Sequence, residues 1–242
     1  MSASKNPRYA RILLKLSGEA LAGNKDMGID AQVLDQMSLS IAHLVGLGVQ
    51  VGIVVGGGNL YRGSQLQKDG LVGRVTGDQM GMLATVINSL ALASALESIN
   101  VVSHVLTAIR MEPIGEYYSK QKAIDYLKKG EVVIVSAGTG NPFFTTDTAS
   151  ALRAIEMETD VMLKGTRVDG IYTADPEKDV NAVKFDEISY DEIYNRNLKV
   201  MDLTATTMCK ENKMPIYVFD MDTVGNLKKV LLGEKIGTLV YV

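Results

Sequence analysis

Cationic side chains lie close to glycines at the ends of two apolar segments of this sequence. Lys15 lies in the apolar segment 12–16, just before a serine and a glycine, and Arg62 follows the three glycines 56–58. Glycines let backbone amides approach an anion closely, and lysine and arginine add positive charge. These residue types in this order predict contacts to the phosphates of a ligand.

A third polar segment with glycines, 137–147, follows another apolar segment. Each segment alone fits a tight turn as well as a binding loop, but three together favour a ligand with several phosphates.

The familiar nucleotide motifs are absent. No glycine is followed by lysine, which excludes a P-loop, and the G-x-G-x-x-G fingerprint fails at Tyr61 and at Phe143. The protein kinase elements H-R-D and D-F-G are also absent.

Apolar segments alternate with helical periodicities, which is typical of a parallel sheet covered by helices on both faces. The expected strands cover 12–16, 49–55, 101–106, 131–136, 161–164, 216–219 and 238–242. The expected helices cover a segment capped by Asp30 that ends near Gly48, and 76–98, 119–129, 147–157, 202–212 and 223–232. We therefore expect one three-layer α/β domain over residues 1–242, with a mainly parallel sheet and a flexible tail over residues 1–9. Ligands of such sheets bind at the carboxyl ends of the strands.

Composition narrows the function classes. The net charge of -3 over 242 residues argues against non-specific nucleic-acid binding, which depends on a basic face. Cys209 is the single cysteine, so no intramolecular disulfide can form, which fits a reducing compartment. No secretory signal, membrane span or Cys/His cluster is expected, and no zinc site is predicted.

The segment 164–176, K-G-T-R-V-D-G-I-Y-T-A-D-P, resembles the signature of the amino acid kinase family. Further segments, in the same order along the chain, resemble the bacterial uridylate kinases within that family. They are 14–20, 56–63, 77–85, 136–147 and 198–202, of which 136–147 is the most specific. The resemblance runs from about residue 10 to the C-terminus. Gln79 and Gly165 depart from the usual pattern without removing a catalytic charge.

The resemblance implies ATP-dependent phosphorylation of UMP in pyrimidine nucleotide biosynthesis. Mg²⁺ is expected to come with ATP, held by phosphate oxygens and water, so no protein metal ligand is named. The resemblance also implies a cytoplasmic homohexamer built from dimers, activated by GTP and inhibited by UTP.

Three residues are expected to carry the chemistry. Lys15 is the main cation at the transferred group, the resemblance makes Lys164 a second one, and it makes Asp147 the carboxylate that holds Lys15. Asp147 could instead cap the helix that it opens. On the ATP side, the resemblance implies contacts from Lys15, Leu16, Ser17, Gly18, Gly58, Arg62, Thr166, Tyr172 and Asp175.

On the UMP side, the expected contacts are Gly57, Asp78, Thr139, Gly140, Asn141, Pro142, Phe143, Phe144, Thr145 and Thr146. Asp78 could accept hydrogen bonds from the ribose hydroxyls, or it could cap the helix that begins nearby. Phe143 or Phe144 could pack on the base or fill the core. Asp202 is a supporting candidate.

Two alternatives remain open at this point. One is a family member that acts on a carboxylate, a carbamate or another phosphate, against which segment 136–147 argues. The other is a nucleotide-binding regulator without turnover, against which the retained Lys15, Asp147 and Lys164 argue.

Overall fold

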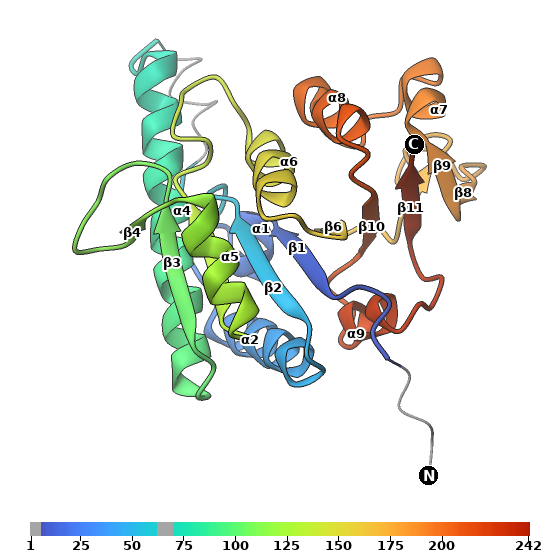
Figure 1. Cartoon of the computed structure of the whole chain (residues 1–242). Helices are drawn as coiled ribbons and strands as arrows, with labels where there is room; N and C mark the ends of the chain where they lie inside the picture. Colours follow the sequence, from blue (N-terminus) through green and yellow to red (C-terminus); the bar gives the residue numbers. More distant parts are fainter. Residues whose placement is uncertain (1–5, 62–69) are drawn as a thin grey trace.

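The computed structural model describes residues 6–61 and 70–242, and within them the chain folds around a central sheet (Figure 1). The sheet has the strand order β4-β3-β5-β2-β1-β6-β10-β11-β9, and every neighbouring pair is parallel except β10–β11. The strands are β1 (Arg11–Leu16), β2 (Gln50–Val55), β3 (Ser103–Thr107), β4 (Glu116–Tyr117), β5 (Val132–Ser136), β6 (Val161–Thr166), β9 (Glu187–Ser189), β10 (Ile216–Asp220) and β11 (Thr238–Tyr241).

Helices cover both faces of this sheet. One face packs against α2 (Ala31–Gly46), α4 (Arg74–Ser98) and α9 (Asn226–Leu231). The other packs against α5 (Lys120–Lys128), α6 (Thr146–Glu156) and α8 (Leu203–Glu211), while α1 (Gly18–Ala22) follows β1 and α7 (Tyr190–Asn195) follows β9. The prediction of a three-layer α/β fold with a mainly parallel sheet is confirmed.

The alternation of side chains along β1 explains how the sheet positions polar groups. Ile12 and Leu14 are buried on the α2 side, and Leu13 is buried on the α6 side. Because side chains alternate between the two faces of a strand, Lys15 shares the α6 side with Leu13. Lys164 is the register partner of Lys15 on β6, so the two lysines leave the sheet side by side on the same face.

Several short elements differ from the sequence-based expectations. The Asp- and Gly-rich stretch expected as a loop contains the hairpin β7 (Ile171–Tyr172) and β8 (Lys184–Phe185), and the segment 110–119 contains β4. Strands this short carry too few residues for a period of two to be recognised. The expected tail lies partly outside the described residues; within them, the Arg8 amide donates to the Leu231 carbonyl at 2.8 Å.

The helix α4 is long and apolar enough to cross a membrane by length and composition, although no span was expected from the sequence. The core helix of a soluble protein passes the same test, so this feature alone indicates little. The inner side of α4 packs on the sheet through Leu92 and Leu96.

Candidate active site

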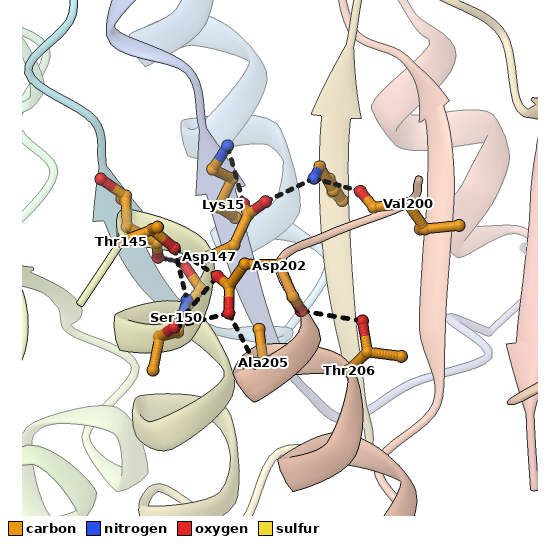
Figure 2. Close-up of polar contacts among 11 residues, drawn as sticks. Lys15, Thr145, Asp147, Ser150, Val200, Asp202, Ala205 and Thr206 are labelled. Atoms are coloured by element: carbon orange, nitrogen blue, oxygen red, sulfur yellow. Dashed lines mark hydrogen bonds and ion pairs between the residues drawn. The ribbon is translucent and has the colours of Figure 1, made fainter. Parts of the chain in front are cut away.

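The lysines of β1 and β6 share one carboxylate. Lys15 Nζ lies 3.1 Å from Asp147 Oδ1, and Lys164 Nζ lies 2.7 Å from Asp147 Oδ2. All three side chains are between 11% and 18% exposed. The contact between Lys15 and Asp147 is an ion pair. Figure 2 shows Asp147 reaching from α6 toward Lys15.

Charge balance in this cluster favours the ionised carboxylate. Burial raises the pKa of Asp147, but the ammonium groups of Lys15 and Lys164 outweigh burial and hold that pKa below its ordinary value. Burial and the like charge of Lys15 together lower the pKa of Lys164, although the Asp147 carboxylate acts in the opposite direction. Asp147 is therefore an anion that is committed to two cations, not a free base.

Asp147 is held in place by the ends of two helices. Thr145 caps α6 by accepting from the Thr148 amide at 3.2 Å, so the alternative that Asp147 caps this helix is wrong. The hydroxyls of Thr145 and Thr148 both donate to Asp202, which itself caps α8 through the Ala205 amide at 2.9 Å (Figure 2). The candidate Asp202 thus connects α6 to α8 beside the cluster.

The backbone before α8 completes the arrangement. Lys164 Nζ donates to the Val200 carbonyl at 2.6 Å as well as to Asp147, which fixes its ammonium group on two elements (Figure 2). Among the described residues, Lys164 is consequently the more constrained of the two lysines.

One cavity of about 500 Å³ opens above the two lysines, and we call it the Lys15 pocket. Its lining includes four of the residues expected on the ATP side, Lys15, Leu16, Ser17 and Thr166, together with Lys164. The sequence analysis missed Arg167 and the segment 221–225, which also line it. The latter follows the carboxyl end of β10 and could have been found from its place in the sheet.

A second cavity of about 430 Å³, the Asp78 pocket, lies beside α4 and the segment that precedes α6. Its lining includes seven of the residues expected on the UMP side, which are Gly57, Asp78, Thr139, Asn141, Phe144, Thr145 and Thr146. Gly58, expected on the ATP side, lines this pocket instead. A Cβ on Gly57 would lie 2.8 Å from Ala84 Cβ, so glycine is what lets this loop approach α4.

Asp78 does not cap a helix. Helix α4 begins at Arg74 with Gly73 as its cap, and Asp78 lies a full turn further on, so the capping alternative is wrong. Its carboxylate accepts from Arg74 Nε at 2.8 Å and from the Phe143 amide at 2.7 Å. The sequence analysis missed Arg74, although its spacing of four from Asp78 is that of a helical ion pair.

Other expected contacts are not part of either cavity lining. Tyr172 donates its hydroxyl to Asp169 at 2.6 Å, and Asp175 pairs with Lys178 at 2.9 Å. The residues Gly18, Gly140, Pro142 and Phe143 also lie outside the two linings, and Arg62 lies outside the described residues. These assignments stay predictions.

We predict that Asp147→Asn destabilises the protein at neutral pH, because two buried ammonium groups then face each other without an anion. Removing one partner of a buried pair costs about 3–5 kcal/mol. The pKa of Asp147 is lowered in the folded state. The stability that its carboxylate contributes is therefore fully present above the ordinary carboxyl pKa of about 3.9, and it is lost as the pH falls through the lowered folded-state pKa. Urea unfolding at fixed protein concentration measures the free energy of unfolding. The difference in this free energy between variant and parent should be constant between pH 8 and 5 and should narrow below about pH 4.

The matched control is Asp191→Asn, since Asp191 also pairs with a lysine but its side chain is 74% exposed. An exposed pair contributes about 0–1 kcal/mol, so this variant should unfold close to the parent. Equal effects of the two substitutions would contradict the assignment of Asp147 as the anion of the cluster.

Comparison with known proteins identifies the family of this chain. The model of the amino acid kinase family matches residues 10–220. The chain is 68% identical to a uridylate kinase of Phocaeicola vulgatus, covering 97% of this chain and 99% of that protein, and 63% identical to one of Acinetobacter baylyi, covering 99% of both. The crystal structure of a UMP kinase from Bacillus anthracis superposes with a TM-score of 0.93 at 37% identity, covering 96% of each chain. This chain belongs to the amino acid kinase family, and within it to the uridylate kinases.

Proposed function

We propose that this protein transfers the γ-phosphoryl group of ATP to UMP, giving ADP and UDP. The observation that carries the proposal is the pair of buried lysine ammonium groups on one carboxylate, with one cavity lined by both lysines and a second lined by the residues at the start of α6. The names of the relatives support UMP as the acceptor, because they are uridylate kinases at 62–68% identity over nearly the whole chain.

This reaction requires that the donor and acceptor phosphates be aligned and that positive charge lie near the transferred group. An oxygen of the UMP phosphate forms the new bond to the γ-phosphorus, and the bond from that phosphorus to the bridging oxygen of ADP breaks. The second pKa of a phosphate monoester is about 6, so the acceptor is already largely dianionic at pH 7. No protein base is needed, which agrees with an Asp147 that is committed to two lysines.

On this proposal, ATP occupies the Lys15 pocket and UMP occupies the Asp78 pocket. Lys15 contacts the transferred group and its bridging oxygen, and Lys164 supplies the second positive charge. Arg74 and Asp78 are placed to bind the UMP phosphate and ribose, respectively, because one offers a guanidinium and the other a carboxylate to the same cavity.

Mg²⁺ fits this site as a partner of ATP. Among residues 6–61 and 70–242, no group of three or more His, Cys, Asp or Glu side chains could hold a metal ion, and both oxygens of Asp147 face lysines. The ion would therefore be held by phosphate oxygens and water, and when bound it would offset negative charge on the phosphates.

We also propose that the protein assembles through α4, acts in the cytoplasm and responds to GTP and UTP. An apolar stripe on the outer side of α4, formed by Met80, Leu83, Ile87 and Leu90, is between 36% and 53% exposed. Its spacing of three and four is that of a helix packed on another helix. The stripe supports a dimer, from which the expected homohexamer would be built. UTP carries the uracil and ribose of UMP and would compete with it, whereas GTP would bind elsewhere.

The first prediction is the reaction itself. Purified protein with ATP, Mg²⁺ and UMP should form UDP and ADP, measured by coupled ADP release and by chromatography of the nucleotides. In parallel reactions, CMP, glutamate and aspartate replace UMP as alternative acceptors. Turnover with an amino acid but not with UMP would favour another reaction of the family. Tight nucleotide binding without any ADP release would favour the regulator without turnover.

The second prediction separates the two pockets by kinetics. Lys15→Ala should lower kcat about 100- to 1000-fold, because it removes a preorganised charge that acts mainly on the transition state. Asp78→Asn should raise KM for UMP and leave KM for ATP nearly constant, since it weakens a contact made equally in the ground and transition states. If Asp78→Asn changes KM for ATP rather than for UMP, the assignment of the two pockets is wrong.

The third prediction concerns assembly and control. Ile87→Asp should dissociate the oligomer in light scattering because it buries a charge in the apolar stripe, whereas Val180→Asp, at a site 97% exposed, should not.

GTP should activate and UTP should inhibit the parent, with a coupling free energy for GTP of about 1–3 kcal/mol. A parent chain that is monomeric, or a rate indifferent to GTP at subsaturating substrates, would refute this part.

A further inference from the structure

A pair of asparagines is buried between the two cavities and touches neither of them. Asn59 follows the glycines 56–58 and is 1% exposed, and Asn88 lies on the inner side of α4 and is fully buried. Asn59 Nδ2 donates to Asn88 Oδ1 at 3.0 Å, and Asn88 Nδ2 donates to Asn59 Oδ1 at 2.7 Å. The two side chains thus form a reciprocal pair of hydrogen bonds.

The remaining hydrogens of both amides reach backbone carbonyls. Asn88 Nδ2 donates to the Gly56 carbonyl at 2.7 Å, and Asn59 Nδ2 donates to the Gly28 carbonyl at 2.8 Å. A carbonyl only accepts, so these two contacts fix which end of each amide is the NH₂ group. The backbone of Asn59 also accepts from the Gly28 amide at 2.9 Å. Three segments, the loop before α2, the glycine loop and α4, are therefore joined at one point.

The same atoms support the loop after β1. A Cβ on Gly18 would lie 2.5 Å from the Gly56 carbonyl oxygen and 2.7 Å from Asn59 Oδ1, so α1 begins in direct contact with the asparagine pair. Ser17, directly before Gly18, lines the Lys15 pocket, and Gly57, directly after Gly56, lines the Asp78 pocket. The position of the pair thus sets the distance between a loop of one cavity and a loop of the other.

From this geometry we infer that Asn59 and Asn88 are positioning residues, which hold the donor and acceptor loops at the separation needed for phosphoryl transfer. The inference rests on the proposed function. The two buried side-chain amides exchange hydrogen bonds to water for hydrogen bonds within the protein, so each bond adds only a modest net stability. Directional bonds to two specified carbonyls instead determine where the loops lie.

The test uses two substitutions of Asn88 in the full-length enzyme. Asn88→Ala removes all three hydrogen bonds of the side chain, two to Asn59 and one to the Gly56 carbonyl. Asn88→Asp keeps the shape and the acceptor for Asn59 Nδ2, but it can donate neither to the Gly56 carbonyl nor to Asn59 Oδ1. Because a misplacement of about 1 Å can cost about 100-fold in rate, kcat should fall about 10- to 100-fold in both variants, with much smaller changes in the two KM values. Calorimetry with UMP alone should give a Kd close to that of the parent.

The matched control is Ser89→Ala, the next residue on α4. Ser89 is fully buried and donates to the Thr85 carbonyl of its own helix at 2.8 Å, so its loss should lower Tm slightly and leave kcat unchanged. Parent-like kcat in folded Asn88 variants overturns the inference while leaving the proposed function intact. Failure of both Asn88 variants to fold also overturns it, in favour of a purely structural pair. A parent that forms no UDP overturns the proposed function and this inference with it.

Discussion

Two ammonium groups lie side by side on neighbouring strands, and this arrangement is the constraint on which the site depends. The register of β1 and β6 makes Lys15 and Lys164 partners, so their charges leave the sheet on the same face. Like charges in a partly buried site repel strongly unless an anion lies between them. Asp147 supplies that anion, and the start of α6 must therefore lie over these two strands. The cap at Thr145 and its hydrogen bond to Asp202 hold the start of α6 in this position.

The helix α4 plays the corresponding role for the Asp78 pocket. The helix holds two loops at three points: Asp78 binds the Phe143 amide and the Thr85 hydroxyl accepts from the Ala137 amide, both in the loop before α6, and Asn88 binds the Gly56 carbonyl. The outer side of the same helix carries the exposed apolar stripe. A partner packed on that stripe would restrain the element that aligns these loops, so assembly and loop geometry are physically connected through α4.

Most of the fold could be predicted from the sequence, because the patterns that determine it are local. The strand expected over 12–16 is observed over Arg11–Leu16, and the helix expected over 76–98 is observed over Arg74–Ser98. The two-residue start of α4 that was missed contains Arg74, so its contact with Asp78 was missed as well. Asn88 could not be recognised, because one polar residue in an apolar helix says nothing of partners 29 and 32 residues away.

The absence of a P-loop has a structural consequence. In this chain the cations come from two adjacent strands, so their separation is set by the roughly 4.8 Å spacing of a sheet and by its ladder of hydrogen bonds. The sheet fixes the backbone positions of the two lysines, so adjustment to a ligand would fall mainly to the loops around them. The segment before α6 is one of these loops. Within it, Ala137 and Phe143 adopt φ values of 61° and 72°, a region that is costly for residues other than glycine. On the proposed function, the two strands supply preorganised charge, and the loops around them would supply the fit to the substrates.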